Sequence, residues 1–462
     1  MNQISIPRLV IAGTHSGVGK TTIVTGLLAA LRQRNLQIQS YKIGPDYIDP
    51  GYHRLASGKP AHNLDTWLVP EEKIVPLFTK TARGNDIALI EGVMGLYDGG
   101  RSGVSSTAAI AKLLQAPVVL VVDAKSMGES VAATVLGYKL YDPGIQFAGV
   151  IVNRLGSDTH REIVCDALQR QGIRVLGCLF RNDALMMPER HLGLTPVTEH
   201  AADETIAAMG RQISQQVDMK QLIDIARQAV WLPEPVPSRH NQLTPKVRIG
   251  VAQDDVFSFY YPESLEVLAA LGAELVPFSP LSGRLIPPDV DGLILGGGFP
   301  EMFVQQLSQN QSMKESILQA YGNNMPILAE CGGLMYLARQ IIDFNGQAFD
   351  MVGAIPAVCK MEKKLQTVGY VEATALSDNL LCPGGDILRG HEFHFSRMIA
   401  EQAHDSWAFQ IKKMRTGIVY PAGFVKKNLL ASYLHLHFSG NEKAAKRLVE
   451  KCAHYRSVRL HQ

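Results

Sequence analysis

The chain has 462 residues, of which 46% are hydrophobic and 19% are charged, a composition typical of folded globular proteins and not of disordered or fibrous ones. Its 45 lysines and arginines nearly balance its 43 aspartates and glutamates, and dense basic runs are absent, so we expect no nucleic-acid partner. The length predicts two or three domains.

The cysteines and the apolar segments indicate the cellular environment. Six cysteines, at positions 165, 178, 331, 359, 382 and 452, lack the CxxC spacing of zinc clusters and disulfide frameworks, which favours reduced thiols. No run of about 18 apolar residues occurs, and residues 1–8 do not resemble the start of a signal peptide. We therefore expect a soluble, cytoplasmic protein with no membrane partner.

Short apolar runs alternate with longer segments of helical pattern in the first half of the chain. The runs are residues 9–12, 87–90, 118–122 and 149–152, and the helical segments include residues 21–34 and 126–141. Continuous apolar strands separated by helices are typical of a parallel sheet covered on both faces. This pattern predicts an α/β domain over residues 1–235.

A helical stretch at residues 199–229 is followed by a proline-rich segment, residues 231–245, which reads WLPEPVPSRHNQLTP. So many prolines exclude helix and central strand, and we expect a linker. A second alternation then begins, with strands expected at 247–252, 275–278, 292–295 and 327–329 and helices at 262–271 and after Pro300. It predicts a second α/β domain over residues 246–462.

Residues 13–22 read GTHSGVGKTT and lie between an apolar strand and a helix, the context of a phosphate-binding loop. Glycines expose backbone N–H groups to phosphate oxygens, and the helix start adds partial positive charge. Lys20 would reach the terminal phosphates, and Thr21 would ligate Mg²⁺. The expected ATP contacts in this loop are Gly13, Thr14, Gly17, Val18, Gly19, Lys20, Thr21 and Thr22.

The loop is similar to the variant phosphate loop of the dethiobiotin synthetase group, because its first glycine stands one place earlier than in G-x4-G-K-T. His15 occupies the place where partition-type ATPases of that superfamily carry a second lysine. The resemblance implies that Glu91, which ends the expected strand at 87–90, binds Mg²⁺ beside Thr21. It also implies that Asn153 reads the adenine.

Other polar residues follow strand-like runs and could complete this site. Asp46, Tyr47 and Asp98 are expected to contact the substrate, with Asp46 as a further ligand of the metal, and Lys42 would be a second phosphate ligand. The alternatives are turn formation by the aspartates beside glycine or proline and a surface position for Lys42. Asp49, in the same segment as Asp46, is equally compatible with a turn.

A second loop, AECGG, places Cys331 between a strand and a helix, where a tight turn and a helix N-terminus favour a reactive thiolate. The segment SYLHLHF puts His435 and His437 on one face of a strand and offers the base that a thiol nucleophile needs. Gly297 and Gly298, in LGGGFPE, follow another strand and could bind an oxyanion. Together they predict thioester chemistry on an amide.

This second constellation resembles the class I glutamine amidotransferases, with Cys331 matching the nucleophile and His435 the histidine. The usual glutamate two residues after the histidine is missing, because His437 stands there. That departure resembles the cobyric and cobyrinic acid amidase subgroup, and it leaves open what orients His435. The motif GHEFHFS at 390–396 also resembles this subgroup, but neither it nor His437 is assigned a role.

The order of the two regions, with the segments YKIGPDYIDP, IEGVMGLYDG and LGGGFPE, resembles the cobyrinate a,c-diamide synthase family of corrinoid biosynthesis. The resemblance implies an ATP-dependent ligase with Mg²⁺ as cofactor and ATP, L-glutamine and a corrinoid macrocycle as partners. Amidation of nickel sirohydrochlorin or hydrogenobyrinate stays open, and a regulatory ATPase with a vestigial hydrolase domain is a more remote alternative. The oligomeric state is also open, a homodimer included.

Overall fold

The computed structural model describes residues 3–100, 104–182, 189–190, 193–194, 199–234, 246–400 and 407–461. The chain divides into two compact units, Met1–Pro237 and Ser238–Gln462. Most of the expected linker, residues 235–245, lies outside the described residues.

The N-terminal unit is built on a parallel sheet of seven strands in the order β4-β3-β5-β2-β6-β7-β8. The strands are β2 (Arg8–Gly13), β3 (Ile38–Ile43), β4 (His62–Leu64), β5 (Ile87–Glu91), β6 (Val118–Asp123), β7 (Phe147–Leu155) and β8 (Val175–Phe180). Strand β2 lies between β5 and β6, so the loop that follows β2 opens at the centre of the sheet.

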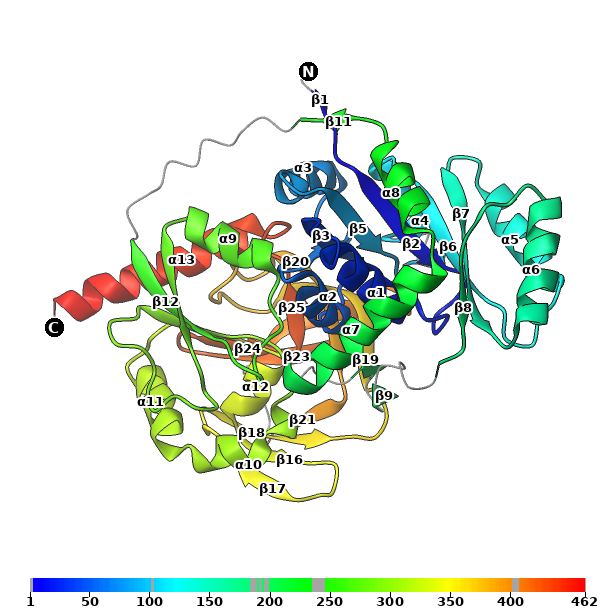
Figure 1. The fold of residues 1–462 in the computed structure, drawn as a ribbon. Helices are drawn as coiled ribbons and strands as arrows, with labels where there is room; N and C mark the ends of the chain where they lie inside the picture. The colour runs from blue at the N-terminus through cyan, green and yellow to red at the C-terminus, as the bar shows by residue number, and fades with distance from the viewer. Residues whose placement is uncertain are drawn as a thin grey trace. The chain divides into compact units, whose positions relative to one another are not determined.

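Helices connect these strands, and Figure 1 shows them on both sides of the sheet. They are α1 (Lys20–Arg32), α2 (Ile48–Ser57), α3 (Glu71–Ala82), α4 (Thr107–Leu113), α5 (Ser130–Tyr141), α6 (Asp158–Arg170), α7 (Glu199–Gln216) and α8 (Met219–Arg227). Four short strands form two small antiparallel ladders: β1 (Gln3–Ile4) pairs with β11 (Leu232–Pro233), and β9 (Glu189–Arg190) pairs with β10 (Gly193–Leu194).

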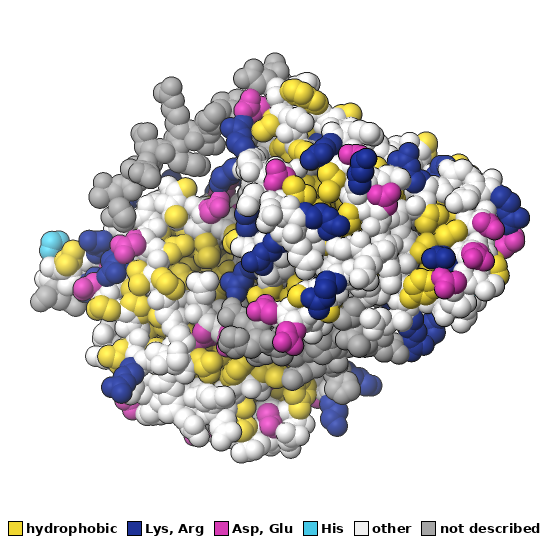
Figure 2. Space-filling view, in the orientation of Figure 1, with side chains coloured by type: hydrophobic (Ala, Val, Ile, Leu, Met, Phe, Trp, Pro, Cys, Tyr) yellow, Lys and Arg dark blue, Asp and Glu magenta, His cyan; other side chains and the backbone are white. Residues whose placement is uncertain are grey.

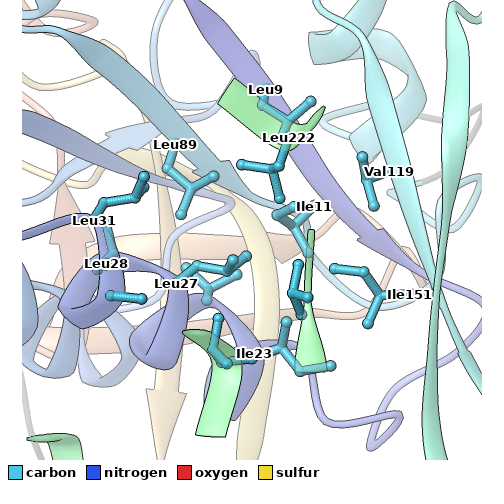
Figure 3. Packing of buried hydrophobic residues seen from close by; sticks show 14 of the residues in the cluster. Leu9, Ile11, Ile23, Leu27, Leu28, Leu31, Leu89, Val119, Ile151 and Leu222 are labelled. Atoms are coloured by element: carbon cyan, nitrogen blue, oxygen red, sulfur yellow. The ribbon is translucent and has the colours of Figure 1, made fainter. Parts of the chain in front are cut away.

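The core of this unit lies between the sheet and helices α1, α7 and α8. Figure 3 shows Leu27 and Ile23 of α1 packed toward Ile11 of β2, with Leu222 of α8 close by. Apolar side chains on both layers leave water together, which is the main favourable contribution to folding. The phosphate loop therefore joins two elements that the core holds rigidly.

The expected helical stretch at residues 199–229 is two helices and not one. Helix α7 ends at Gln216, and Asp218 begins α8 by accepting a hydrogen bond from the backbone N–H of Gln221 at 2.9 Å. Aspartate side chains stabilise helix starts in this way. The apolar pattern continues through the break because both helices face the same core.

One half of the main sheet in the C-terminal unit is parallel. The order of this ten-stranded sheet is β13-β12-β14-β15-β24-β23-β22-β19-β20-β25. The parallel strands are β12 (Val247–Ala252), β13 (Ala273–Phe278), β14 (Gly292–Leu295), β15 (Ile327–Glu330) and β24 (Leu429–Ser432). The alternating pattern in the sequence correctly located the first four of them.

The other half is antiparallel, and of its strands the sequence patterns indicated only β25, which contains His435. Its strands are β19 (Thr367–Ala375), β20 (Ile387–His394), β22 (Trp407–Lys413), β23 (Val419–Lys426) and β25 (Leu434–Leu436). A separate four-stranded sheet contains β16 (Ala338–Ile342), β17 (Ala348–Asp350), β18 (Ile355–Met361) and β21 (Ser396–Ala400).

Helices cover the parallel half of the C-terminal sheet. They are α9 (Pro262–Ala270), the 3-10 helix η3 (Pro300–Met302), α10 (Val304–Gln309), α11 (Gln311–Gly322), α12 (Gly332–Leu337) and α13 (Glu442–Leu460). Helices α9 and α13 lie side by side over β12, as Figure 1 shows. Leu268 of α9 and Leu448 of α13 are fully buried in that layer.

The surface carries charges of both signs. On the face in Figure 2, lysine and arginine side chains are interspersed with aspartate and glutamate side chains, as the net charge of +2 suggests. Within the described ranges, no helix combines the length and the apolar character required to cross a membrane.

Candidate active sites

The loop after β2 has a backbone that only glycine adopts easily. Gly17 and Gly19 have φ of 79° and 94°, in the left-handed region that side chains disfavour. A Cβ on Gly19 would lie 2.5 Å from Nδ2 of Asn153, and a Cβ on Gly13 would lie 2.6 Å from Cγ1 of Val18. The loop is thus closed tightly upon itself and upon the end of β7.

Three residues outside the loop hold its backbone. Asn153 Nδ2 donates to the carbonyl of Val18 at 2.8 Å, and Arg154 donates to the carbonyl of Gly17 at 2.9 Å while pairing with Asp123. The hydroxyl of Tyr138, from α5, donates to the carbonyl of Thr14. Each carbonyl that is bound from outside fixes the direction of the peptide groups in the loop.

Lys20 and Thr21 begin α1 and lie next to the carboxyl end of β5. The Lys20 ammonium donates to the carbonyl of Met94 at 2.5 Å, and burial, with repulsion from Lys42, lowers the pKa of Lys20 to about 8. The Thr21 hydroxyl donates to Oε1 of Glu91 at 2.8 Å. The structure therefore brings together two of the three residues that the sequence proposed as magnesium ligands, Thr21 and Glu91; the third is Asp46.

Glu91 is the centre of a buried group of charges. Lys42 Nζ lies 2.8 Å from its Oε1, and His53 Nε2 lies 2.6 Å from its Oε2. Burial alone would raise the pKa of Glu91, but Lys42 and His53 hold it well below the usual range. Glu91 is consequently an ionised carboxylate in a site with almost no exposure to water.

Lys42 also pairs with Asp49 of α2, whose Oδ2 lies 2.5 Å from its ammonium. Burial opposes the charge on Lys42, yet Asp49 and Glu91 raise its pKa above the ordinary value. For Asp49, burial and the neighbouring Asp46 raise the pKa. In this arrangement the Lys42 ammonium, proposed as a phosphate ligand, is held by two carboxylates.

The two other aspartates of the predicted site take part in turns. Asp46 Oδ1 accepts the backbone N–H groups of Ile48 at 2.7 Å and of Asp49 at 3.4 Å. Asp98 Oδ2 accepts the N–H of Gly95 at 3.0 Å. Tyr47 lies between Asp46 and the start of α2. These bonds match the turn alternative and also set the direction of each carboxylate.

In the C-terminal unit, Cys331 lies on a sharp turn between β15 and α12. Its φ of 47° and ψ of −100° are unfavourable for a residue with a side chain, at a cost on the order of 1–3 kcal/mol. A bond of 2.7 Å from its N–H to the carbonyl of Ser432 holds the turn in place. Strained positions of this kind expose a nucleophile above the sheet.

Glycines allow the second loop to approach this turn. A Cβ on Gly332 would lie 3.0 Å from the backbone nitrogen of Gly298, and the N–H of Gly333 donates to the carbonyl of Gly296 at 3.0 Å. A Cβ on Gly297 would lie 2.6 Å from Cε1 of His435. The loop at 296–298 is thereby in contact with both the cysteine turn and the histidine.

His435 lies on β25, buried and paired in register with His391 of β20. Burial alone would lower the pKa of His435, but the Cys331 thiol and the Glu330 carboxylate raise it to about 10. The ring of His391 stacks on that of His435, with centroids 4.9 Å apart. His435 is therefore a protonated ring enclosed by protein.

His437 lies in a different environment. Its ring stacks on Tyr261 at 4.6 Å, its Nε2 lies 3.8 Å from Glu263 Oε2, and burial lowers its pKa to about 4. The Tyr261 hydroxyl lies 3.0 Å from Nε2 of His391. Of the two histidines in SYLHLHF, His435 is thus the one that interacts with the cysteine.

Family models and full-length relatives match this chain. Residues 9–194 match the CobQ/CobB/MinD/ParA nucleotide binding domain, and residues 248–443 match the CobB/CobQ-like glutamine amidotransferase domain. A cobyrinate a,c-diamide synthase of Dehalococcoides mccartyi strain CBDB1 is 46% identical, covering 96% of this chain and 98% of that protein. A hydrogenobyrinate a,c-diamide synthase of Streptomyces coelicolor is 42% identical, covering 97% and 98%.

The chain belongs to the cobyrinate a,c-diamide synthase family. Another member, from Syntrophotalea carbinolica, is 41% identical over 97% of this chain and 99% of its own length. Two predictions from the sequence are confirmed: a nucleotide-binding α/β domain followed by an amidotransferase α/β domain, and an ATP-dependent ligase with glutamine as nitrogen donor. Membership of the cobyrinate a,c-diamide synthase family disfavours the regulatory ATPase with a vestigial hydrolase domain.

For this member of the cobyrinate a,c-diamide synthase family, sequence reasoning missed several residues near both sites. His53 follows Asp49 by one helical turn on α2, so the spacing could have indicated it. Arg154 and Tyr138 contact the loop only because β7 and α5 end beside it. Glu330 lies next to Cys331 in the chain, but nothing in the motif reveals its approach to His435.

Proposed function

We propose that this enzyme amidates the a and c carboxylates of cobyrinate, with ATP as activator and glutamine as nitrogen donor. The observation that carries the proposal is the similarity over nearly the whole length to relatives named cobyrinate a,c-diamide synthase. We assign ATP and macrocycle binding to residues 1–235 and glutamine hydrolysis to residues 246–462. A carboxylate is a poor electrophile at neutral pH, and conversion to an acyl phosphate makes its carbon open to attack by ammonia.

In the proposed glutaminase reaction, the Cys331 thiolate attacks the side-chain amide of glutamine. The N–H groups of Gly298 and Gly332, whose backbones are in contact, would bind the oxyanion that develops. His435, which is protonated near neutral pH, gives its proton to the departing ammonia. Water then cleaves the thioester and releases glutamate.

In the proposed activation step, the substrate carboxylate attacks the terminal phosphoryl group of ATP and ADP leaves. Lys20 would neutralise charge on that group, and the Thr21 hydroxyl and the ionised Glu91 offer hard oxygen donors that fit Mg²⁺. Mg²⁺, when bound, supplies further charge neutralisation. Among the described residues no group of three or more His, Cys, Asp or Glu forms a metal cluster, which agrees with an ion bound mainly through phosphates.

The remaining polar residues would position the substrates. Asp46, Tyr47 and Asp98 lie on the loops after β3 and β5, at the carboxyl edge of the sheet where ligands bind in open α/β folds. Asp46 would also help to hold the metal. Asn153 would contact the adenine while it supports the loop through Val18, and Lys42 would reach the phosphates when Asp49 releases it.

A second candidate substrate is hydrogenobyrinate, the metal-free macrocycle. The observation that favours it is the relative from Streptomyces coelicolor, which is named for that substrate and aligns with 97% of this chain. Both substrates carry the same carboxylates, so the residues that bind ATP and glutamine do not distinguish them.

One experiment tests the substrate and the acyl phosphate together. The enzyme is given MgATP, glutamine and a macrocycle whose carboxylates carry ¹⁸O, in separate reactions with cobyrinate, hydrogenobyrinate and nickel sirohydrochlorin. We expect mass spectrometry to show a diamide from cobyrinate and one ¹⁸O atom in phosphate for each amide formed. A diamide from only hydrogenobyrinate or only nickel sirohydrochlorin would replace the proposed substrate, and unlabelled phosphate would contradict the acyl phosphate.

A further inference from the structure

The histidine of the proposed glutaminase site needs an acidic partner, and the position two residues after it holds His437. A histidine that exchanges a proton with a thiol works best when a third group fixes its ring and stabilises its charge. His437 cannot do so, because burial keeps it neutral and it interacts with Tyr261 and Glu263. The partner must therefore come from another element.

Glu330 lies in the required place. It is the last residue of β15, directly before Cys331, and its Oε2 lies 3.7 Å from Nδ1 of His435. The side chains are shielded from water, with 14% of Glu330 and 2% of His435 exposed. The positive φ of 47° at Cys331 lets the last residue of β15, Glu330, and the turn residue after it, Cys331, reach the same imidazole.

Several other ionisable side chains of the described residues interact with His435. The carboxylate among them besides Glu330 is Glu392, which is therefore the alternative acidic partner. The groups that interact with His435 are Cys331, Glu330, His391, Glu392 and His394. Burial lowers the pKa of both His391 and His394, so both rings are neutral and cannot stabilise a charged His435 as a carboxylate would. Burial raises the pKa of Glu392, and its carboxylate is hydrogen-bonded by the hydroxyl of Tyr420.

We propose that Glu330 is the positioning residue of the glutaminase site, orienting the imidazole of His435 through Nδ1 and stabilising its protonated form. This inference rests on the proposed roles of Cys331 and His435. In the resting site the proton of the Cys331 thiol is already held on the other ring nitrogen of His435, so the pair is a thiolate and an imidazolium, and the same proton later leaves with ammonia. The acid of this triad precedes the nucleophile in the chain, whereas the usual class I pattern has a glutamate two residues after the histidine.

The test compares glutaminase activity across pH in Glu330→Gln, Glu330→Asp and a matched control, Glu263→Gln. The control removes the carboxylate that lies 3.8 Å from His437, the other histidine of the segment. Circular dichroism and thermal unfolding establish that each variant is folded. The KM for glutamine is measured separately from kcat.

We expect Glu330→Gln to lower kcat at least about tenfold, since losing an opposite charge at this range changes a pKa by about one unit or more. The alkaline limb of the pH profile should move down by about one pH unit, because the imidazolium loses its proton more easily. The KM for glutamine and the profile of Glu263→Gln should stay as in the unmodified enzyme. Glu330→Asp, which keeps the charge on a shorter side chain, should be more active than Glu330→Gln.

If Glu330 contributed only packing, Glu330→Gln would be more active than Glu330→Asp. Glutamine has the size of glutamate, whereas aspartate is smaller. The proposal is overturned if Glu330→Gln keeps the normal kcat and alkaline limb, or if Glu330→Asp is the less active variant. If Glu330→Gln does not fold, the pH dependence of Cys331 alkylation is compared between Glu330→Ala and the unmodified enzyme, and an unchanged dependence in this variant without the carboxylate contradicts the proposal. Glutaminase activity that survives in Cys331→Ser would instead remove the proposed nucleophile.

Discussion

Individual side chains set the charge of the proposed ATP site before any nucleotide binds. Lys42, Glu91, Asp49 and His53 form a buried group in which each charge has an opposite or hydrogen-bonding neighbour. Lys20 lies outside these ion pairs and bonds to the carbonyl of Met94. Because none of these ion pairs offsets its burial, the charged form of Lys20 is disfavoured, and its pKa is lowered.

We predict that MgATP binding takes up a proton at pH 8.5. The pKa of Lys20 is about 8 without ligand, so part of the population is neutral at this pH, and nearby phosphate charges raise the pKa and restore the proton. Isothermal titration calorimetry in buffers of different ionisation enthalpy measures the uptake. It should diminish at pH 6.5, where Lys20 is already protonated, and be absent in Lys20→Arg; equal uptake in that variant would contradict the assignment.

At the residue scale, the sequence predicted side chains whose position in a motif dictates their chemistry. Cys331 after a strand, Lys20 and Thr21 at a helix start, and Glu91 at a strand end are of this kind; the structure has each of them at that position, and their roles stay predictions. Glu330 was missed because its contact with His435 depends on how β15 and β25 are placed in the sheet. No spacing rule connects residues so far apart in the chain.

At the scale of elements, the phosphate loop is held by the ends of β7 and α5 as well as by β2 and α1. Asn153 and Arg154 from β7 and Tyr138 from α5 bind three of its carbonyl groups. A loop fixed in this way needs little reordering when phosphate binds, which lowers the entropic cost of binding.

We predict that Gly19→Ala destabilises the N-terminal unit by about 1–3 kcal/mol and weakens MgATP binding. The new Cβ would require a left-handed backbone and would lie 2.5 Å from Asn153 Nδ2. Gly137→Ala in α5 is the matched control, since nothing lies within 4 Å of its Cβ and alanine favours helix by about 0.5–1 kcal/mol. Thermal unfolding and nucleotide titration provide both measurements, and normal behaviour of Gly19→Ala would show that the loop geometry is wrong.

The elements that the sequence located best are the strands buried on both faces, such as β12 and β14, because they appear as continuous apolar runs. Apart from β25, the antiparallel strands were missed for a physical reason. In β19, for example, the buried residues Val371, Ala373 and Ala375 alternate with partly exposed ones, so the strand forms no continuous apolar run and a search for such runs passes over it. The two helices at 199–227 were merged because one core holds both.

For the whole molecule, nitrogen release and carboxylate activation are assigned to different compact units. Each unit has its own core and its own sheet. A substitution in one site should therefore leave the fold of the other unit intact, and the two half-reactions can be separated.

We predict that Cys331→Ser loses amidation from glutamine but keeps amidation from ammonium salts. Lys20→Ala should lose amidation from either nitrogen source while retaining part of its glutaminase activity, because the acyl phosphate does not form. Glutamate release measures the glutaminase half-reaction, and mass spectrometry of the macrocycle measures the amidation. Amide formation by Lys20→Ala with free ammonia would contradict the role of the phosphate loop.

The path of the chain through the C-terminal sheet determines when the glutaminase can first act. Strand β15, which carries Glu330 and leads to Cys331, gains its neighbour β24 only after β19, β20, β22 and β23 have been made, and His435 of β25 follows β24. A nascent chain on the ribosome thus displays the cysteine long before its base exists. Glutaminase activity by the proposed mechanism is therefore expected only from chains that have been synthesised through β25.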